Sequence, residues 1–218
     1  MKALIESLRI GPEKNFCYLI MCQETFECAL IDPAFECDRI IAWVTDLVRK
    51  KNPNRNASIQ YLIATHGHWD HAGGMPEMLK RVPGAKVVAG KNETSRLKKN
   101  HIPLHKSVDD EEEFFVGRVK IKALHTPGHT EGGACFIVDD QIFTGDTLFV
   151  GQCGRTDFEG GSDELLFSSL QKLKTLPGGL IVRPGHDYGA SPESTISKEI
   201  ATNPTMGAQS IEEFKALP

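Results

Sequence analysis

Four segments of the 218-residue chain share one order: an apolar run, small turn residues, and then a side chain suited to binding metal. They are YLIAT (61–65) before HGHWDH (66–71), IKALHTPG (121–128) before His129, QIFTG (141–145) before Asp146, and LIVRPG (180–185) before His186. Apolar, β-branched runs of this length are typical of buried strands. Functional side chains are concentrated on the loops that a rigid scaffold presents. The chain is therefore expected to fold so that four strand ends present these loops.

The side chains that follow the four runs form a donor set for metal. They are His66, His68, Asp70, His71, His129, Asp146 and His186. Imidazole and carboxylate together suit zinc, iron or manganese. Seven ligands exceed one tetrahedral zinc site, but they fit two ions with one carboxylate bridging them. On an extended segment His66 and His68 point the same way, whereas Asp70 and His71 lie past the turn and can reach a second ion.

The remaining histidines and charge runs have simpler interpretations. His101, His105 and His125 stand alone in the sequence, and we interpret them as structural or surface residues. The basic stretch 91–100 is interpreted as a solvated helix face and the acidic run 109–113 as a solvated turn, because like charges repel and stay hydrated.

Composition limits the partners of the chain. The net charge is −4 and no basic patch is visible, which argues against nucleic acid and anionic membranes as partners. No apolar run approaches the roughly 18 residues of a membrane span. None of the six cysteines forms a CxxC pair, and Glu6 and Arg9 interrupt the apolar N-terminal stretch. These features favour a reduced, cytoplasmic protein without a disulfide framework.

The order of expected elements favours an α/β fold of two mixed halves. Strands are expected at 3–10, 16–22, 28–33, 59–65, 85–90, 118–125, within 133–146 on both sides of a turn at Asp139–Asp140, and from 179; helices are expected at 37–50, 75–82, 163–176 and 191–203. In the last helix Ser191 would be the cap and Pro192 the first helical residue. Two sheets packed together, with helices outside, would satisfy this order.

The motifs THGHWDH, TPGHT, FTGDTLF and PGHDYG occur in that order along the chain. In these motifs, over roughly residues 14–203, the chain resembles the metallo-β-lactamase superfamily. The resemblance implies an αββα sandwich with metals at one edge between the sheets. By position it implies a first metal site of His66, His68 and His129, a second of Asp70, His71 and His186, and Asp146 as the bridging carboxylate. True β-lactamases of this fold commonly have a cysteine at the position of Asp146, so antibiotic hydrolysis is not expected.

Within the superfamily, the chain resembles two branches more closely than the others. GDTLFVGQCGRTDFEGG (145–161) is similar to glyoxalase II, which hydrolyses S-acylglutathione thioesters, and GRTDF followed by HDYG is similar to persulfide dioxygenases. Glyoxalase II has a longer helical C-terminal domain that holds glutathione. We expect a single domain over 1–218 without that separate C-terminal domain.

The leading functional prediction is a hydrolase that cleaves a small S-acylglutathione-like thioester, or another thiol conjugate, with a metal-bridging hydroxide. It would use two divalent ions, zinc foremost and iron or manganese as alternatives, with Asp70 and Asp146 acting in catalysis as well as in binding. The alternative is a dioxygenase with a single Fe(II) held by His66, His129 and Asp146, acting on glutathione persulfide. The composition argues against a nuclease, and the full ligand set argues against a non-catalytic binding module.

Three further residues have a candidate role near the centre, and a fourth, Cys153, does not. Arg155 could bind a substrate carboxylate or form a loop-shaping pair with Asp157. Tyr188 could hydrogen-bond substrate or pack beside it. Asp32 is a candidate acceptor for a ligating histidine, because metal-bound imidazoles usually have such a partner. Cys153 is interpreted as structural and not as a nucleophile.

Overall fold

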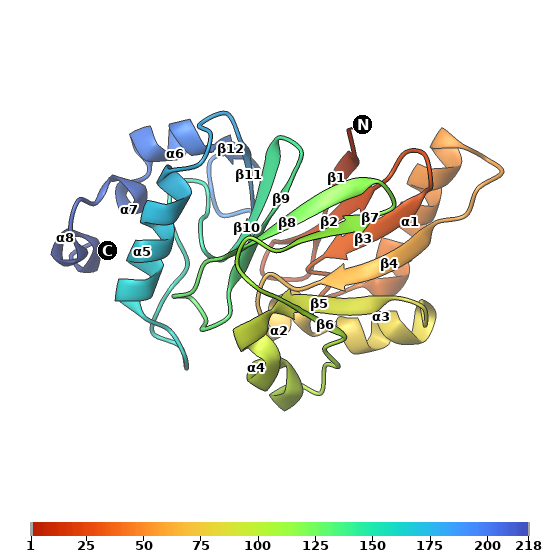
Figure 1. The fold of residues 1–218 in the computed structure, drawn as a ribbon, viewed down its shortest axis with the longest axis horizontal. Helices are drawn as coiled ribbons and strands as arrows, with labels where there is room; N and C mark the ends of the chain where they lie inside the picture. Colours follow the sequence, from red (N-terminus) through yellow and green to blue (C-terminus); the bar gives the residue numbers. More distant parts are fainter. Residues whose placement is uncertain (1, 218) are drawn as a thin grey trace.

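Two six-stranded sheets pack face to face in the computed structural model, which describes residues 2–217 (Figure 1). The first sheet contains β1 (Leu4–Ile10), β2 (Asn15–Met21), β3 (Glu27–Ile31), β4 (Ser58–Ile63), β5 (Lys86–Gly90) and β6 (Lys106–Val108), in that spatial order. Its first three strands are antiparallel, and β3 to β6 run parallel. The first sheet is therefore mixed, as expected.

The second sheet has the spatial order β12-β11-β10-β9-β8-β7. Its strands are β7 (Glu113–Val116), β8 (Val119–His125), β9 (Ala134–Val138), β10 (Gln141–Gly145), β11 (Ile181–Pro184) and β12 (Ser194–Thr195). The pair β10–β11 is parallel and the other neighbouring pairs are antiparallel. Both β10 and β11 consequently end at the same edge.

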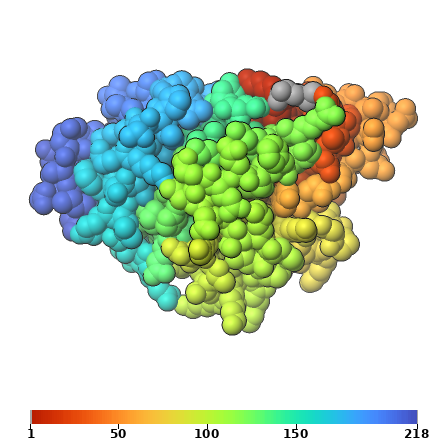
Figure 2. Space-filling view, in the orientation of Figure 1, coloured from red at the N-terminus to blue at the C-terminus, as the bar shows by residue number. Residues whose placement is uncertain are grey.

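Helices cover the outer face of each sheet. The first half carries α1 (Cys37–Lys51), α2 (Trp69–Ala72), α3 (Met75–Arg81), the 3-10 turn η1 (Lys91–Glu93) and α4 (Thr94–Lys99); the second carries α5 (Asp163–Lys174), α6 (Ile196–Thr202), α7 (Pro204–Gly207) and α8 (Ile211–Lys215). In Figure 2 the blue C-terminal helices form one end of the molecule and the orange α1 segment forms the other. The predicted two-sheet architecture with outer helices is confirmed.

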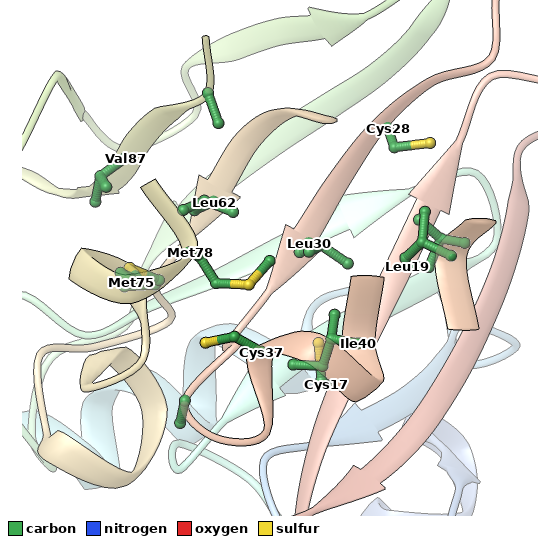
Figure 3. Close-up of a cluster of buried hydrophobic side chains, with 14 of the residues drawn as sticks. Cys17, Leu19, Cys28, Leu30, Cys37, Ile40, Leu62, Met75, Met78 and Val87 are labelled. Atoms are coloured by element: carbon green, nitrogen blue, oxygen red, sulfur yellow. The ribbon is translucent and has the colours of Figure 1, made fainter. Parts of the chain in front are cut away.

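Strand β2 shows how the sequence builds these layers. All seven of its residues are buried, because each face of the strand meets an apolar layer. Cys17 and Leu19 face the helices of the first half, whereas Tyr18 and Ile20 face the second sheet. This alternation follows from the two-residue period of a strand. Figure 3 shows the helix-side layer, in which residues of α1 and α3, such as Ile40 and Met78, meet the strands.

The expected helix over 191–203 begins later than the sequence indicated. Ser194–Thr195 pairs with β11 as a short edge strand, and the helix starts at Ile196. The cap is Thr195, whose hydroxyl accepts a hydrogen bond from Lys198 N, whereas the Ser191 hydroxyl donates to Glu193 O. Pairing with β11 thus overrides the local Ser-Pro start pattern, and the prediction of Ser191 as the cap was wrong.

All six cysteines are free, and five of them are buried. Within residues 2–217, none of the helices is long and apolar enough to cross a membrane; the longest, α1, has 15 residues.

Candidate metal centre

The strands β4, β8, β10 and β11 end at a common edge, and the predicted ligand side chains follow these ends. His66 comes after β4, and the short helix α2 then begins after His68. His129, Asp146 and His186 follow β8, β10 and β11 respectively. Segments up to 120 residues apart in sequence therefore meet at this edge, as the repeated strand-and-turn pattern predicts.

All seven predicted side chains come together in three overlapping groups. These groups are His66–His68–His129, His66–His71–Asp146 and Asp70–His71–His186, and within each group the potential ligand atoms lie within 4.8 Å of one another. The first and third groups have the membership that the sequence motifs imply. His101, His105 and His125 lie outside them: His105 Nδ1 accepts from Val87 N, and His125 Nε2 donates to Glu131 O.

The carboxylate of Asp146 lies between the first and third groups. Its Oδ2 is 3.5 Å from His129 Nε2. Its Oδ1 is 3.2 Å from His71 Nε2 and 3.5 Å from His186 Nε2. One oxygen thus faces each group, which is an arrangement that suits a carboxylate bridging two ions.

Hydrogen bonds on the outer ring nitrogens fix the orientation of the imidazoles. His129 Nδ1 donates to Arg155 O at 2.6 Å, and His186 Nδ1 donates to Glu13 O at 2.8 Å. His71 Nδ1 lies 2.9 Å from Asp32 Oδ2, so Asp32 has the predicted role of a histidine acceptor. With Nδ1 protonated in this way, the Nε2 lone pair of each ring points to the centre.

Two buried polar atoms in the centre lack a hydrogen bond of good geometry among the described residues: His66 Nε2, and Asp146 Oδ1, which lies 3.2 Å from His71 Nε2. An unpaired buried polar atom is costly and needs an explanation. A lone pair on His66 Nε2 and a charged oxygen on Asp146 are both electron donors, so a cation between them would satisfy both. The donor set therefore fits divalent metal ions.

The charges of the centre are strongly coupled. Burial lowers the pKa of His71, but the carboxylates of Asp146 and Asp32 outweigh it and hold that pKa well above its ordinary value. Burial also opposes the charge on His186, yet Asp146 and Asp70 raise its pKa to about 9. Burial, followed by the charge of His71, holds the pKa of His66 well below its usual range. In the absence of metal, protons on His71 and His186 thus balance the carboxylates, and an ion must displace them.

The turn after β10 requires a glycine. Gly145 has a φ of +48°, and a Cβ atom there would fall 2.4 Å from Thr65 Oγ1. Thr65 cannot retreat, because its hydroxyl donates to Asp32 Oδ2 and its N–H donates to Asp32 Oδ1. The ends of β4 and β10 can therefore approach each other only with glycine at this position.

A cleft of about 540 Å³ opens over the centre and has aromatic walls. Tyr188 stacks on His186 with ring centroids 4.5 Å apart, and its side chain is half exposed. Phe158 lies on the opposite side, against His68 and His129, and Trp69 is 64% exposed at the rim. The cleft can therefore hold a small molecule by stacking and apolar contact beside the seven ligand-type side chains.

Arg155 lines this cleft, but its guanidinium is already paired. Its Nε and Nη2 donate to the two carboxylate oxygens of Asp157 at 2.9 and 2.5 Å, and it lies over the Phe158 ring. This geometry matches the loop-shaping alternative for Arg155. Burial raises the pKa of the Cys153 thiol to about 11, so it carries little thiolate, in keeping with a structural role.

Sequence reasoning missed two side chains that support the centre. Asn15 Nδ2 donates to Asp70 O at 2.8 Å and to Asp70 Oδ2 at 3.2 Å. Glu93 accepts hydrogen bonds from the loops that carry His66, His68 and His129. The sequence marks neither residue: Asn15 stands just before the expected strand 16–22, and Glu93 lies within the basic stretch 91–100.

Comparison with known proteins places this centre in a family. A family profile of the metallo-beta-lactamase superfamily matches residues 10–186, which include every residue of the cluster. The chain belongs to the metallo-beta-lactamase superfamily. The resemblance seen in the motifs is confirmed, and members of this superfamily bind metals.

Relatives of this metallo-beta-lactamase superfamily protein carry out two kinds of reaction. It is 34% identical over 200 residues to the probable hydroxyacylglutathione hydrolase glo2 of Schizosaccharomyces pombe, covering 90% of this chain and 72% of that protein. It is also 34% identical over 204 residues to the mitochondrial persulfide dioxygenase ETHE1 of Homo sapiens, covering 92% and 74%. The crystal structure of ETHE1 from Myxococcus xanthus matches with a TM-score of 0.85 at 32% identity, covering 99% of this chain and 92% of that one.

Proposed function

We propose that this protein is a hydrolase with two metal ions that cleaves a thioester of a small thiol, such as an S-acylglutathione. The observation that carries the proposal is the position of Asp146, whose two oxygens face two different groups of ligand atoms. His66, His68 and His129 would hold one ion, Asp70, His71 and His186 the other, and Asp146 would bridge them. The similarity to glo2 supports the choice of thioester.

Two divalent ions held in this way would lower the pKa of a bound water and stabilise negative charge that develops on a carbonyl oxygen. Zinc is the leading candidate, and iron or manganese also accept these donors. The protein contributes the fixed geometry of the donors, which the hydrogen bonds to Asp32, Arg155 O and Glu13 O maintain.

Asp70 is suited to orient the attacking water. Burial raises its pKa, but His186 and His71 outweigh burial and hold the pKa far below its usual range, so the group is ionised. Asn15 donates to Oδ2 and to the backbone carbonyl, which fixes the direction of the carboxylate. An ionised, fixed acceptor at the floor of the cleft can hold a water hydrogen and so direct the oxygen of that water toward substrate.

Thioester hydrolysis suits a centre without a dedicated proton donor. The reaction breaks the C–S bond, forms a C–O bond, and releases a thiolate whose conjugate acid has a pKa of about 8.5. Such a group leaves without obligatory protonation. Tyr188, Phe158 and Trp69 at the cleft would contact the non-reacting parts of the substrate.

A persulfide dioxygenase is the second candidate, and the similarity to the two ETHE1 proteins favours it. In that case His66, His129 and Asp146 would hold a single Fe(II), which supplies oxygen chemistry at open coordination positions. The other four side chains would then orient the ligands by hydrogen bonds.

Metal analysis of anaerobically purified protein, combined with two assays, separates the candidates. Two ions per chain and hydrolysis of S-lactoylglutathione are expected for the proposed function. One iron per chain, with oxygen consumed only when glutathione persulfide is added, would overturn it in favour of the dioxygenase.

His71→Ala gives an independent test. The variant is expected to lose one ion and most of the hydrolase activity, because His71 belongs to the third group and also faces Asp146. His101→Asn is the matched control, since His101 is exposed and its left-handed conformation (φ 56°) is one that asparagine tolerates. Full metal content and activity in the His71 variant would contradict the two-ion proposal.

A further inference from the structure

The 3-10 turn η1 places a buried carboxylate behind the centre. Glu93 ends this turn, between β5 and α4, and is only 1% exposed. It is not a member of any of the three groups of potential ligands. A buried acidic side chain needs hydrogen-bond partners, and these identify what Glu93 does.

Its partners belong to two different loops of the centre. Oε2 accepts from Gly67 N at 3.0 Å, and Gly67 lies between His66 and His68. Oε1 accepts from Gly132 N at 3.2 Å and from the Thr130 hydroxyl, in the loop that follows His129. Glu93 is thus the acceptor shared by both loops that carry the first group of imidazoles.

The segment around Glu93 holds these loops closely. A Cβ atom at Gly67 would lie 2.7 Å from Glu93 Oε2, and one at Gly132 would lie 2.2 Å from Glu93 N. From the same segment, Asn100 Nδ2 donates to Gly67 O at 2.8 Å. The peptide groups on both sides of Gly67 are therefore fixed by one short stretch of chain, and the loops have little freedom to separate.

We propose that Glu93 is a positioning residue that holds His66, His68 and His129 at the spacing needed for one metal ion. The inference rests on the proposed metal centre and extends it to a residue outside the ligand set. Glu93 has no hydrogen bond to Asp70, His71 or His186, which instead have Asn15, Asp32 and Glu13 O as partners. Its effect is therefore specific to the first group.

The chemistry of the contacts requires a carboxylate. Glu93 accepts three hydrogen bonds on two oxygens, and two of the donors are backbone N–H groups that cannot reverse their roles. Glutamine has the same shape but only one acceptor oxygen. In either orientation its NH₂ group faces the N–H of Gly67 or of Gly132, so one loop loses its anchor.

Titration of metal-free protein with Co(II), followed by visible absorption, tests the proposal. His68→Ala and His186→Ala assign the absorption bands to the first and third groups. Glu93→Gln is expected to weaken Co(II) binding at the first group about 10- to 100-fold and to alter its bands, while the third group keeps wild-type affinity. Glu131→Gln is the matched control, because Glu131 is an exposed glutamate of the same His129 loop.

Each other outcome is decisive. If Glu93→Gln binds Co(II) at both groups with wild-type affinity and wild-type bands, the inference is wrong. It is also wrong if Co(II) affinity falls equally at both groups, because an equal loss indicates a general structural role. Wild-type protein that binds no Co(II) removes the proposed metal centre and this inference with it. If Glu93→Gln does not fold, Thr130→Val decides, since it removes one donor to Glu93 at nearly constant volume: a smaller loss confined to the first group supports the inference, and unchanged affinity overturns it.

Discussion

The imidazole of His68 presents a different nitrogen to the centre from its neighbours. His68 Nδ1 lies 2.9 Å from His129 Nε2, whereas His71, His129 and His186 use Nδ1 for outward hydrogen bonds. The amide oxygen of asparagine, which could bind metal, extends from the backbone about as far as histidine Nδ1. The amide oxygen of glutamine extends about as far as Nε2. The two nitrogens of histidine are therefore distinct in this centre.

This difference predicts opposite substitution preferences at two positions. His68→Asn is expected to retain more bound metal than His68→Gln, while His129→Gln is expected to retain more than His129→Asn. Metal content per chain after dialysis against a fixed free-metal buffer checks the prediction. The same order of retention at both positions would contradict the assigned ring orientations.

Tyr188 can be tested separately for its ring and its hydroxyl. The ring is stacked on His186 at an interplanar angle of 7°. Tyr188→Phe is therefore expected to keep kcat/KM within about twofold, whereas Tyr188→Ala is expected to raise KM about tenfold, the value of a lost aromatic contact of 1 to 1.5 kcal/mol. Steady-state kinetics with the thioester substrate provide the measurement. A large effect of the phenylalanine variant would instead assign the role to the hydroxyl.

The sequence predicts the seven ligand-type residues better than the residues that support them. His129, Asp146 and His186 each follow an apolar run and a turn, which is a pattern that can be recognised in one dimension. Glu93 and Asn15 act through bonds to backbone groups of distant loops. Such bonds require only an acceptor or donor at the correct place in space, so they leave no spacing pattern in the sequence.

At the scale of elements, the acidic run 109–113 has more contacts than a solvated turn requires. Asp110 Oδ1 accepts from His125 N at the end of β8 and from the Lys172 ammonium of α5. Burial raises the pKa of Asp110, but Lys172 and the His125 N–H outweigh burial and lower it below the ordinary value. The carboxylate thus links a strand to a helix.

The lowered pKa predicts a pH-dependent contribution to stability. Because the folded pKa is below the unfolded pKa of about 3.9, the contribution is present above that pH and is lost as the pH falls through the folded value. Asp110→Asn is expected to reduce the free energy of unfolding of metal-free protein by up to about 1 kcal/mol at pH 7, with a smaller difference near pH 3. Urea denaturation at both pH values checks this, with Asp109→Asn as the control. An equal difference at both pH values would contradict it.

The boundaries of the elements were harder to predict than the presence of the strands and long helices. The strand runs and the long helices could be read from periodicity, as in α1 and α5. The start of α6 could not, because the pairing of Ser194–Thr195 with β11 is a contact between distant residues. The order of strands within each sheet is likewise decided by nonlocal packing.

At the scale of the whole molecule, the two sheets share the centre. His66, His68, Asp70 and His71 come from the first half, and His129, Asp146 and His186 come from the second. Each ion bound there would connect the two halves and bind the native state alone, which stabilises it by about 4 kcal/mol when free metal is 1,000 times the Kd.

Metal removal is therefore expected to lower the Tm by about 10 °C for each ion lost, because each kcal/mol corresponds to about 2–4 °C for a chain of this size. Thermal denaturation before and after chelation measures the change. Asp146→Asn serves as the control, since the Tm of this variant is expected to change much less on chelation than the Tm of the wild type. An unchanged Tm in the wild type would contradict binding of metal across the sheets.

The contact between the start of β2 and the end of β11 determines when the centre is completed during synthesis. Asn15 pairs with His186, and Phe16 N donates to Gly185 O. His186 follows His71 by 115 residues, which a ribosome adds in roughly 6 to 23 s at about 5–20 residues per second. In a nascent chain, the three imidazoles of the first group can come together while the third group still lacks His186. The two ions of the proposed centre would then bind at different times, and the second would bind only after β11 and His186 have been translated.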